Sequence, residues 1–427
     1  MGGRLAAIAL VAFAQVGCPG GAATGAPPSS QDSGRDTPPP GDDTARSDTA
    51  NSSEPNPRDC DGQPSPRAIP LVVVPSPCGN IVSDVVFIPG VPQVVISERA
   101  GCETGTGGII TALDAATGET RWRRRYPEAS DGGYAWIYGS RDGSDLTALL
   151  ADGDDRRELR AVDVIDSAGA AVARVSAVEH GVAGMFAVSE ASLAVSVLRP
   201  YGDGRGALAV FASPLPRFAE WTRADAVHSQ PPGTCCDFGA RVMDVGDPTG
   251  DGLRDLLVLG GGAWLLSGDL VATSEGILAA PSVDIVGYER SETVGPVGDF
   301  TGDGLDDFST STDGIVEIVA GGTLEGAVQF RSRDYDQRPG NSVVPVGTVG
   351  ANDASTIVLS GGDHPMGDHY WLVTGPLCGR EYVEDAGERI GAPGDPAEFY
   401  SLDGADGFIF GKGFNDGEVV KARVATD

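Results

Sequence analysis

Two stretches of the chain carry the same acidic pattern, D-x-T-G-D-G-L-x-D. "DPTGDGLRD" begins at Asp247, and "DFTGDGLDD" begins at Asp299, which follows it by 52 residues (299 − 247). Carboxylates crowded this closely repel one another unless a cation lies among them. The side chains at positions one, three, five and nine and the carbonyl at position seven can converge on one point, and the glycine at position six permits the sharp turn.

These positions give two candidate cation sites made only of oxygen ligands. Calcium accepts about six to eight such ligands in flexible geometry, whereas magnesium demands a tight octahedron and keeps its waters, so we expect Ca²⁺ in both sites. The expected ligands are Asp247, Thr249, Asp251, the Leu253 carbonyl and Asp255 in the first site, and Asp299, Thr301, Asp303, the Leu305 carbonyl and Asp307 in the second.

Two other interpretations of the acidic motifs compete with this one. An EF-hand loop needs a bidentate glutamate at its twelfth position, where these stretches have Val258 and Thr310, so that interpretation fails. The segment "DLLVLGG" that follows the first motif also predicts a buried strand and not an exiting helix. The second alternative is a pair of polar β-turns, because Asp, Thr and Gly favour turns in any case.

The acidic motifs belong to a longer repeat. "PVGTVGANDASTIVLSGG" from Pro345 aligns with the stretch from Pro296, with Thr348 in place of Asp299. Further copies give about seven units, which begin near residues 80, 132, 180, 238, 290, 340 and 395. A period of about 50 residues, with short apolar runs between turns, predicts one blade of four antiparallel strands per unit. We therefore predict an all-β fold, a β-propeller of about seven four-stranded blades over residues 67–427.

The repeat resembles the FG-GAP repeat of integrin α-type β-propellers and their bacterial relatives. Phe238 and Gly239 match the Phe-Gly pair that opens a blade in that family. The resemblance implies a calcium loop in the hairpin between the first two strands of a blade, and threonine at position three implies a weaker site. "ALDAATGETRW" resembles the docking segment of quinoprotein-type propellers, which implies that Trp122 packs between neighbouring blades.

The N-terminus predicts export. Residues 1–18 hold one basic residue, Arg4, and an apolar run too short to span a bilayer but long enough for a signal peptide. The closing "QVGC" resembles a bacterial lipobox, although Gln15 departs from the usual leucine, and this implies lipidation of Cys18. The alternative is an ordinary signal peptide cleaved near Gly17. We expect an exported lipoprotein of the bacterial outer membrane or cell surface, held to the membrane by its lipid alone.

Residues 19–66 are rich in Pro, Ser, Thr, Asp and Gly and cannot bury enough apolar surface to fold, so we predict a disordered tether. Six further cysteines are an even number, which suits disulfides in an oxidising compartment. The sequence does not choose among the pairings of Cys60, Cys78, Cys102, Cys235, Cys236 and Cys378.

Composition limits the possible partners. The formal net charge of −31 repels nucleic acid. The one local histidine cluster, "DHPMGDHY" at residues 363–370, is better explained as a hairpin turn than as an acid–base site. We expect a non-catalytic monomer that binds a protein or a polysaccharide. The alternatives are a propeller-fold glycan hydrolase or lyase, and a structural protein of the envelope.

Overall fold

The chain divides into two compact units, Met1–Asp59 and Cys60–Asp427. All residues described by the computed structural model lie in the second unit. The expected signal peptide, Cys18, the tether and all seven cysteines lie outside the described residues, so these remain predictions. The described residues are 72–75, 82–88, 90–99, 108–126, 137–140, 143–151, 161–176, 182–197, 206–229, 238–239, 241–260, 263–267, 276–277, 294–312, 314–333, 339–348, 355–361, 369–377, 379–390, 402–405, 408–412 and 418–423.

The strands form seven sheets, which we call blades 1 to 7 in chain order. Blade 1 holds β2 (Val82–Ile88), β3 (Gln93–Arg99), β4 (Gly108–Asp114) and β5 (Thr120–Tyr126). Blade 2 holds β6 (Ile137–Gly139), β7 (Thr147–Ala151), β8 (Ala161–Ile165) and β9 (Ala171–Ser176). Blade 3 holds β10 (Val182–Val188), β11 (Ser192–Val197), β12 (Ala207–Ala212) and β14 (Ala226–Ser229). Blade 4 holds β15 (Arg241–Gly246), β16 (Asp255–Leu259) and β17 (Ala263–Leu266).

Blades 5 to 7 complete the set. Blade 5 holds β19 (Val294–Gly298), β20 (Asp307–Thr312), β21 (Ile315–Val319) and β22 (Gly326–Arg331). Blade 6 holds β23 (Pro339–Thr348), β24 (Ser355–Gly361), β25 (His369–Thr374) and β27 (Gly387–Ile390). Blade 7 holds β28 (Leu402–Ala405), β29 (Phe408–Lys412) and β30 (Glu418–Arg423), with β1 (Val72–Pro75) from the other end of the unit paired to β30.

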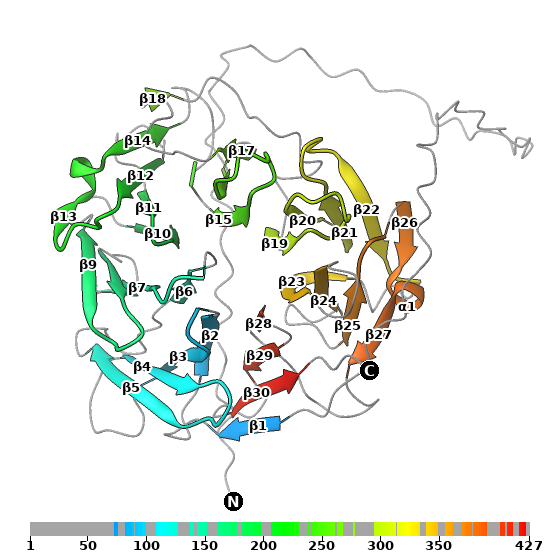
Figure 1. The fold of residues 1–427 in the computed structure, drawn as a ribbon, viewed down its shortest axis with the longest axis horizontal. Coiled ribbons are helices and arrows are strands. Elements are labelled where there is room, and N and C mark those ends of the chain that lie inside the picture. The colour runs from blue at the N-terminus through cyan, green and yellow to red at the C-terminus, as the bar shows by residue number, and fades with distance from the viewer. Residues whose placement is uncertain are drawn as a thin grey trace, which may run out of the picture. The chain divides into compact units, whose positions relative to one another are not determined.

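The blades close into a ring through their first strands. Each of β2, β6, β10, β15, β19, β23 and β28 contacts the next, and β28 contacts β2 (Figure 1). The predicted β-propeller is therefore confirmed. Six blades have four or more strands as predicted, whereas blade 4 has three within the described residues. No helix in the described part of the chain is long and apolar enough to cross a membrane.

Both faces of each blade are covered by neighbours, which is why several strands are apolar along their whole length. The four residues Val86, Ile110, Ile137 and Leu149 belong to one core cluster shared by blades 1 and 2. Trp122 packs against this cluster, and a methyl group at Gly169 of blade 2 would lie 2.8 Å from its indole ring. The structure thus confirms that this tryptophan packs between neighbouring blades.

Three short segments add a parallel strand to the outer edge of the preceding blade. They are β13 (Ala219–Glu220) on β9, β18 (Gly276–Ile277) on β14, and β26 (Gly379–Tyr382) on β22. The 3₁₀ helix η1 (Trp221–Arg223) follows β13, and the single helical turn α1 (Val383–Ala386) follows β26. These segments tie neighbouring blades together at the rim of the ring.

Candidate metal centre

Each acidic motif occupies the hairpin between the first two strands of its blade, as the resemblance implies. The first motif joins β15 to β16 in blade 4, and the second joins β19 to β20 in blade 5. Gly252 and Gly304, at position six, have φ angles of 84° and 88°. This left-handed conformation strains other residues, so the turn requires glycine there.

The aspartate at position one organises each loop from inside. Asp247 Oδ1 accepts hydrogen bonds from the backbone N–H groups of Gly250 (2.7 Å) and Asp251 (3.1 Å), and its Oδ2 accepts one from Gly252 (2.8 Å). In the second loop Asp299 accepts the three corresponding bonds, at 2.7, 3.0 and 2.9 Å. The two loops therefore share one hydrogen-bonded conformation, although only part of their sequence is identical.

The aspartate at position five is exposed in both loops but has different partners. Asp251 accepts a hydrogen bond from the Leu253 N–H (2.8 Å) and another from the Ser267 hydroxyl (2.6 Å). The hydrogen bond from Ser267 is the main cause that lowers the pKa of Asp251, and the bond from Leu253 is the next largest. Asp303 accepts only the Leu305 N–H, at 3.0 Å, and its other carboxylate oxygen accepts no hydrogen bond within the described residues.

The aspartate at position nine is buried, which sequence reasoning missed. Asp307 is fully buried and accepts N–H bonds from Phe300 (2.8 Å) and Thr301 (2.7 Å) on one oxygen and from Gly321 (2.8 Å) on the other. Burial raises the pKa of Asp307 to about 6, the three N–H donors oppose that rise, and the nearby charge of Asp303 adds a smaller increase. This side chain holds the loop against its own blade.

Asp255 repeats this arrangement in blade 4. It is also fully buried, and its Oδ2 accepts the Thr249 N–H at 3.2 Å. Because both position-nine carboxylates face inward, each of them serves the fold whether or not an ion is bound.

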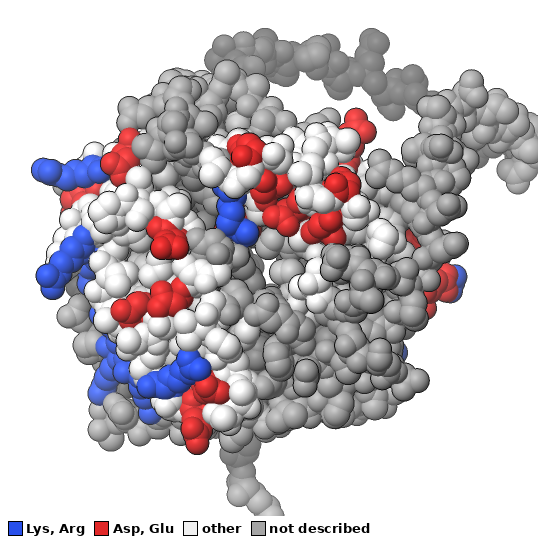
Figure 2. Space-filling view, in the orientation of Figure 1, with Lys and Arg blue, Asp and Glu red and all other residues white. Residues whose placement is uncertain are grey.

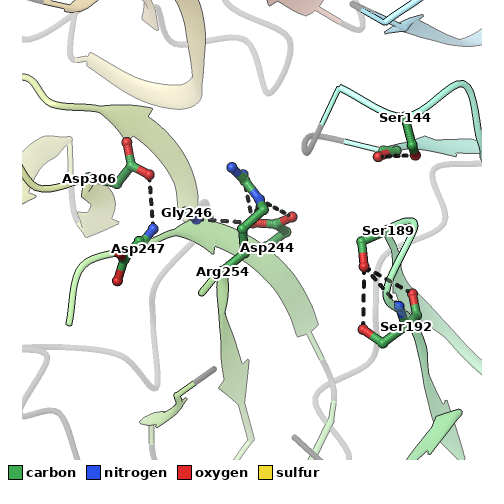
Figure 3. A network of polar contacts seen from close by, with 9 residues as sticks. Ser144, Ser189, Ser192, Asp244, Gly246, Asp247, Arg254 and Asp306 are labelled. Atoms are coloured by element: carbon green, nitrogen blue, oxygen red, sulfur yellow. Dashed lines mark hydrogen bonds and ion pairs between the residues drawn. The ribbon is translucent and has the colours of Figure 1, made fainter. Parts of the chain in front are cut away.

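Position eight joins the two loops, and the sequence analysis assigned it no role. Asp306 Oδ2 accepts the N–H of Asp247 at 2.9 Å, and a methyl group at Gly246 would lie 2.1 Å from the same oxygen. The equivalent residue in blade 4, Arg254, instead pairs with Asp244 at 2.8 Å (Figure 3). Position eight is an arginine in the first motif and an aspartate in the second. This difference in charge was the sequence signal that the two loops face different neighbours.

The acidic side chains gather over blades 4 and 5 (Figure 2). Within the described residues, however, no three carboxylate, histidine or cysteine side chains converge closely enough to hold a metal ion. The chemistry of the donor set fits calcium, since every donor is an oxygen. The aspartates at positions one and five lie in the loop itself, while the carboxylates at position nine accept hydrogen bonds from backbone N–H groups. The structure thus brings the expected ligands into one loop without drawing them to one point.

Two other sequence features can be located. Phe238 is buried and contacts Trp264 edge to face, with ring centroids 5.1 Å apart, so the Phe-Gly pair anchors the start of blade 4. Of the histidine cluster, only His369 and Tyr370, at the start of β25, lie within the described residues.

No protein-family model and no curated protein matches the chain. Among solved structures, the chain is similar to BamB from Moraxella catarrhalis at 16% identity, with 82% of this chain and 84% of that chain covered and a TM-score of 0.39. It is similar to the virginiamycin B lyase from Staphylococcus aureus at 10% identity, with 84% and 100% covered and a TM-score of 0.47. By its own sheet topology, the chain is an all-β propeller.

Proposed function

We propose that the chain is an exported lipoprotein whose calcium-stabilised, FG-GAP-like propeller binds a protein or a polysaccharide outside the cell, without catalysing a reaction. Export and anchoring rest on residues 1–18 and on Cys18. The tether of residues 19–66 would hold the propeller away from the membrane surface.

One observation carries the calcium assignment. Two loops in neighbouring blades adopt the same conformation around Asp247 and Asp299, and each places a further exposed carboxylate, Asp251 or Asp303, at position five. In the second loop burial is the main cause that raises the pKa of Asp307, and repulsion from the Asp303 charge adds a smaller increase. A divalent cation in the loop would relieve that repulsion.

Calcium would be held by the oxygens of positions one, three, five and nine and by the carbonyl of position seven. Asp251 and Asp303 are exposed, and turning toward an ion would cost Asp251 its hydrogen bond from Ser267, whereas Asp303 has no such side-chain partner within the described residues. Asp255 and Asp307 would have to share their oxygens between the ion and the backbone N–H groups that now donate hydrogen bonds to them. Bound calcium would fix the hairpins of blades 4 and 5 and the Asp306 contact between them.

The test is thermal unfolding with and without calcium. Binding to the folded state alone stabilises it by about 3 kcal/mol per site when calcium is roughly 100-fold above its dissociation constant, so a chelator should lower Tm. Magnesium at equal concentration should restore little of the loss, because it dehydrates reluctantly. A Tm indifferent to chelator, with fewer than two calcium ions bound by calorimetry, would refute the assignment and leave two ordinary turns.

A further inference from the structure

A pocket of about 520 Å³ lies at the outer edge of blade 2, on different strands from the acidic loops. One wall comes from β9 and the other from the segment that leads through β13 into η1. The lining residues are Arg174, Ser176, Phe218, Ala219, Glu220 and Arg223.

The second wall is held on a fixed backbone. Ala219 and Glu220 pair in parallel with Val175 and Ser176 of β9. The next residue, Trp221, is 8% exposed and belongs to the core cluster between blades 2 and 3. This anchor keeps the neighbouring outward side chains in place, so a ligand would not have to order the segment.

Phe218 is 75% exposed, the most exposed of the large apolar side chains in the described residues. Three residues after Phe218, the side chain of Trp221 lies in the core. An exposed aromatic ring flanked by polar groups offers an apolar face to a ligand that is itself partly polar.

The polar groups around Phe218 include a positive charge that the chain does not neutralise. The sequence has 61 acidic and 30 basic residues, so acidic partners are abundant. Nevertheless the side chains of Arg223 and Glu220 make no ion pair or hydrogen bond with the described part of the chain. Arg174, across the pocket, lies 3.6 Å from Asp163. A guanidinium left unpaired in an acidic protein suits an external anion.

Further arginines lie along the rim, but the chain supplies acidic partners for two of them. The outer strand of blade 1, β5, reads "TRWRRRY", and Arg121, Arg123 and Arg125 are exposed on it. Arg121 pairs with Asp114 at 2.7 Å, and Arg123 pairs with Glu98 at 3.7 Å. Arg124 donates to the Gly169 carbonyl of blade 2 at 3.4 Å, so this strand and blade 2 are directly joined. Figure 2 shows Lys and Arg side chains along the side of the ring where β5, β9 and β13 lie. Because Arg121 and Arg123 already have acidic partners, the unpaired Arg223 in the pocket is the cation best suited to an anionic group of a ligand.

We propose that the pocket binds an acidic sugar unit of an anionic polysaccharide. A sugar ring stacks on Phe218, its carboxylate pairs with Arg223, and its hydroxyls donate to Glu220. The glutamate favours a sugar over an acidic peptide, because a sugar offers several hydroxyl donors to a carboxylate, whereas the ionised side chains of an acidic peptide offer none. This inference rests on the proposed binding function and names its ligand class.

The test is titration of the full chain with oligogalacturonate by calorimetry, in calcium and in chelator. The matched ligands are the methyl ester of the same oligosaccharide, which removes only the charge, and poly-L-glutamate. Arg223→Ala should weaken oligogalacturonate binding about tenfold and Phe218→Ser about fivefold, both with unchanged Tm. Arg380→Ala, an exposed arginine on β26, is the control and should bind as the wild type does.

The methyl ester should bind at least tenfold more weakly than the acid. Equal binding of acid and ester, or equal losses in Arg223→Ala and Arg380→Ala, would overturn the proposal. Preference for poly-L-glutamate with no effect of Phe218→Ser would overturn it in favour of an acidic polypeptide. A panel of neutral polysaccharides distinguishes failure of this inference from failure of the proposed function. Binding to neutral polysaccharides alone refutes the anionic ligand but keeps the proposed function. No binding to any probe counts against both.

Discussion

The buried carboxylate of Asp307 predicts an unusual pH dependence of stability in the absence of calcium. Its pKa rises from an ordinary value of 3.8 to about 6 in the folded protein, chiefly because the group is buried. Between these two values the folded chain holds a proton that the unfolded chain releases, so the free energy of unfolding falls as pH rises. Asp307 therefore stabilises the fold most below pH 3.8, and this contribution is lost as pH rises through 6.

The size of the effect follows from the pKa. Over the full range it is at most about 3 kcal/mol, and between about pH 5 and about pH 7.5 it is roughly 1.4 kcal/mol. That window avoids most of the titration of ordinary carboxylates, which are already ionised at its lower end. Asp251, whose pKa is lowered, loses its contribution only at more acidic pH and works in the opposite direction.

The assay is urea denaturation in chelator at both pH values. The control is Asp307→Asn, which keeps one acceptor oxygen but cannot titrate, so the difference between wild type and variant isolates this residue. Asp303→Asn should reduce the wild-type effect slightly, because it removes the neighbouring charge that raises the pKa of Asp307. Saturating calcium should abolish or reverse the slope, since a metal ligand must be ionised. Equal pH dependence in wild type and Asp307→Asn would refute the reasoning.

Three further predictions follow from the loops and the N-terminus. In denaturation experiments Gly246→Ala should destabilise the fold by roughly 2–3 kcal/mol, because the alanine strains a φ of 82° and displaces Asp306. Gly252→Ala should cost roughly 1–2 kcal/mol, because its new methyl group has no atom within 4 Å. Equal losses of stability in the two variants would contradict the Asp306 contact. Asp303→Ala should lower the calcium stoichiometry by one site in calorimetry while the Asp247 site keeps its affinity, and loss of both sites would argue against separate loops. Metabolic labelling with a fatty-acid analogue should mark the wild type and not Cys18→Ser, and equal labelling of both would end the lipoprotein interpretation.

The repeat was readable from the sequence because each blade begins with a short apolar strand and a turn. The units expected near residues 80, 132, 180, 238, 290, 340 and 395 correspond to first strands that begin at Val82, Ile137, Val182, Arg241, Val294, Pro339 and Leu402. The placement of the acidic loops between first and second strands was readable from the family resemblance.

The direction of the individual carboxylates was not readable. Asp307 and Asp303 are both aspartates of the same motif. Asp307 is buried against backbone N–H groups of its blade, whereas Asp303 is exposed. The added strands β13, β18 and β26 also escaped prediction, because their two to four residues pair with a neighbouring blade and have no local pattern. The exposure of Phe218 depends on the same tertiary contacts.

The pairing of β1 with β30 bears on how the protein acquires its structure. Val72 pairs with Lys421, so blade 7 is completed by residues 349 positions apart (421 − 72). Closing so long a loop costs about 5 kcal/mol of chain entropy, and such distant contacts slow folding. Blades 1 to 6 are built from strands near one another in the chain and can form during synthesis. The ring itself can close only after the last strand has emerged, so a chain cut short before Glu418 would leave β1 without its partner.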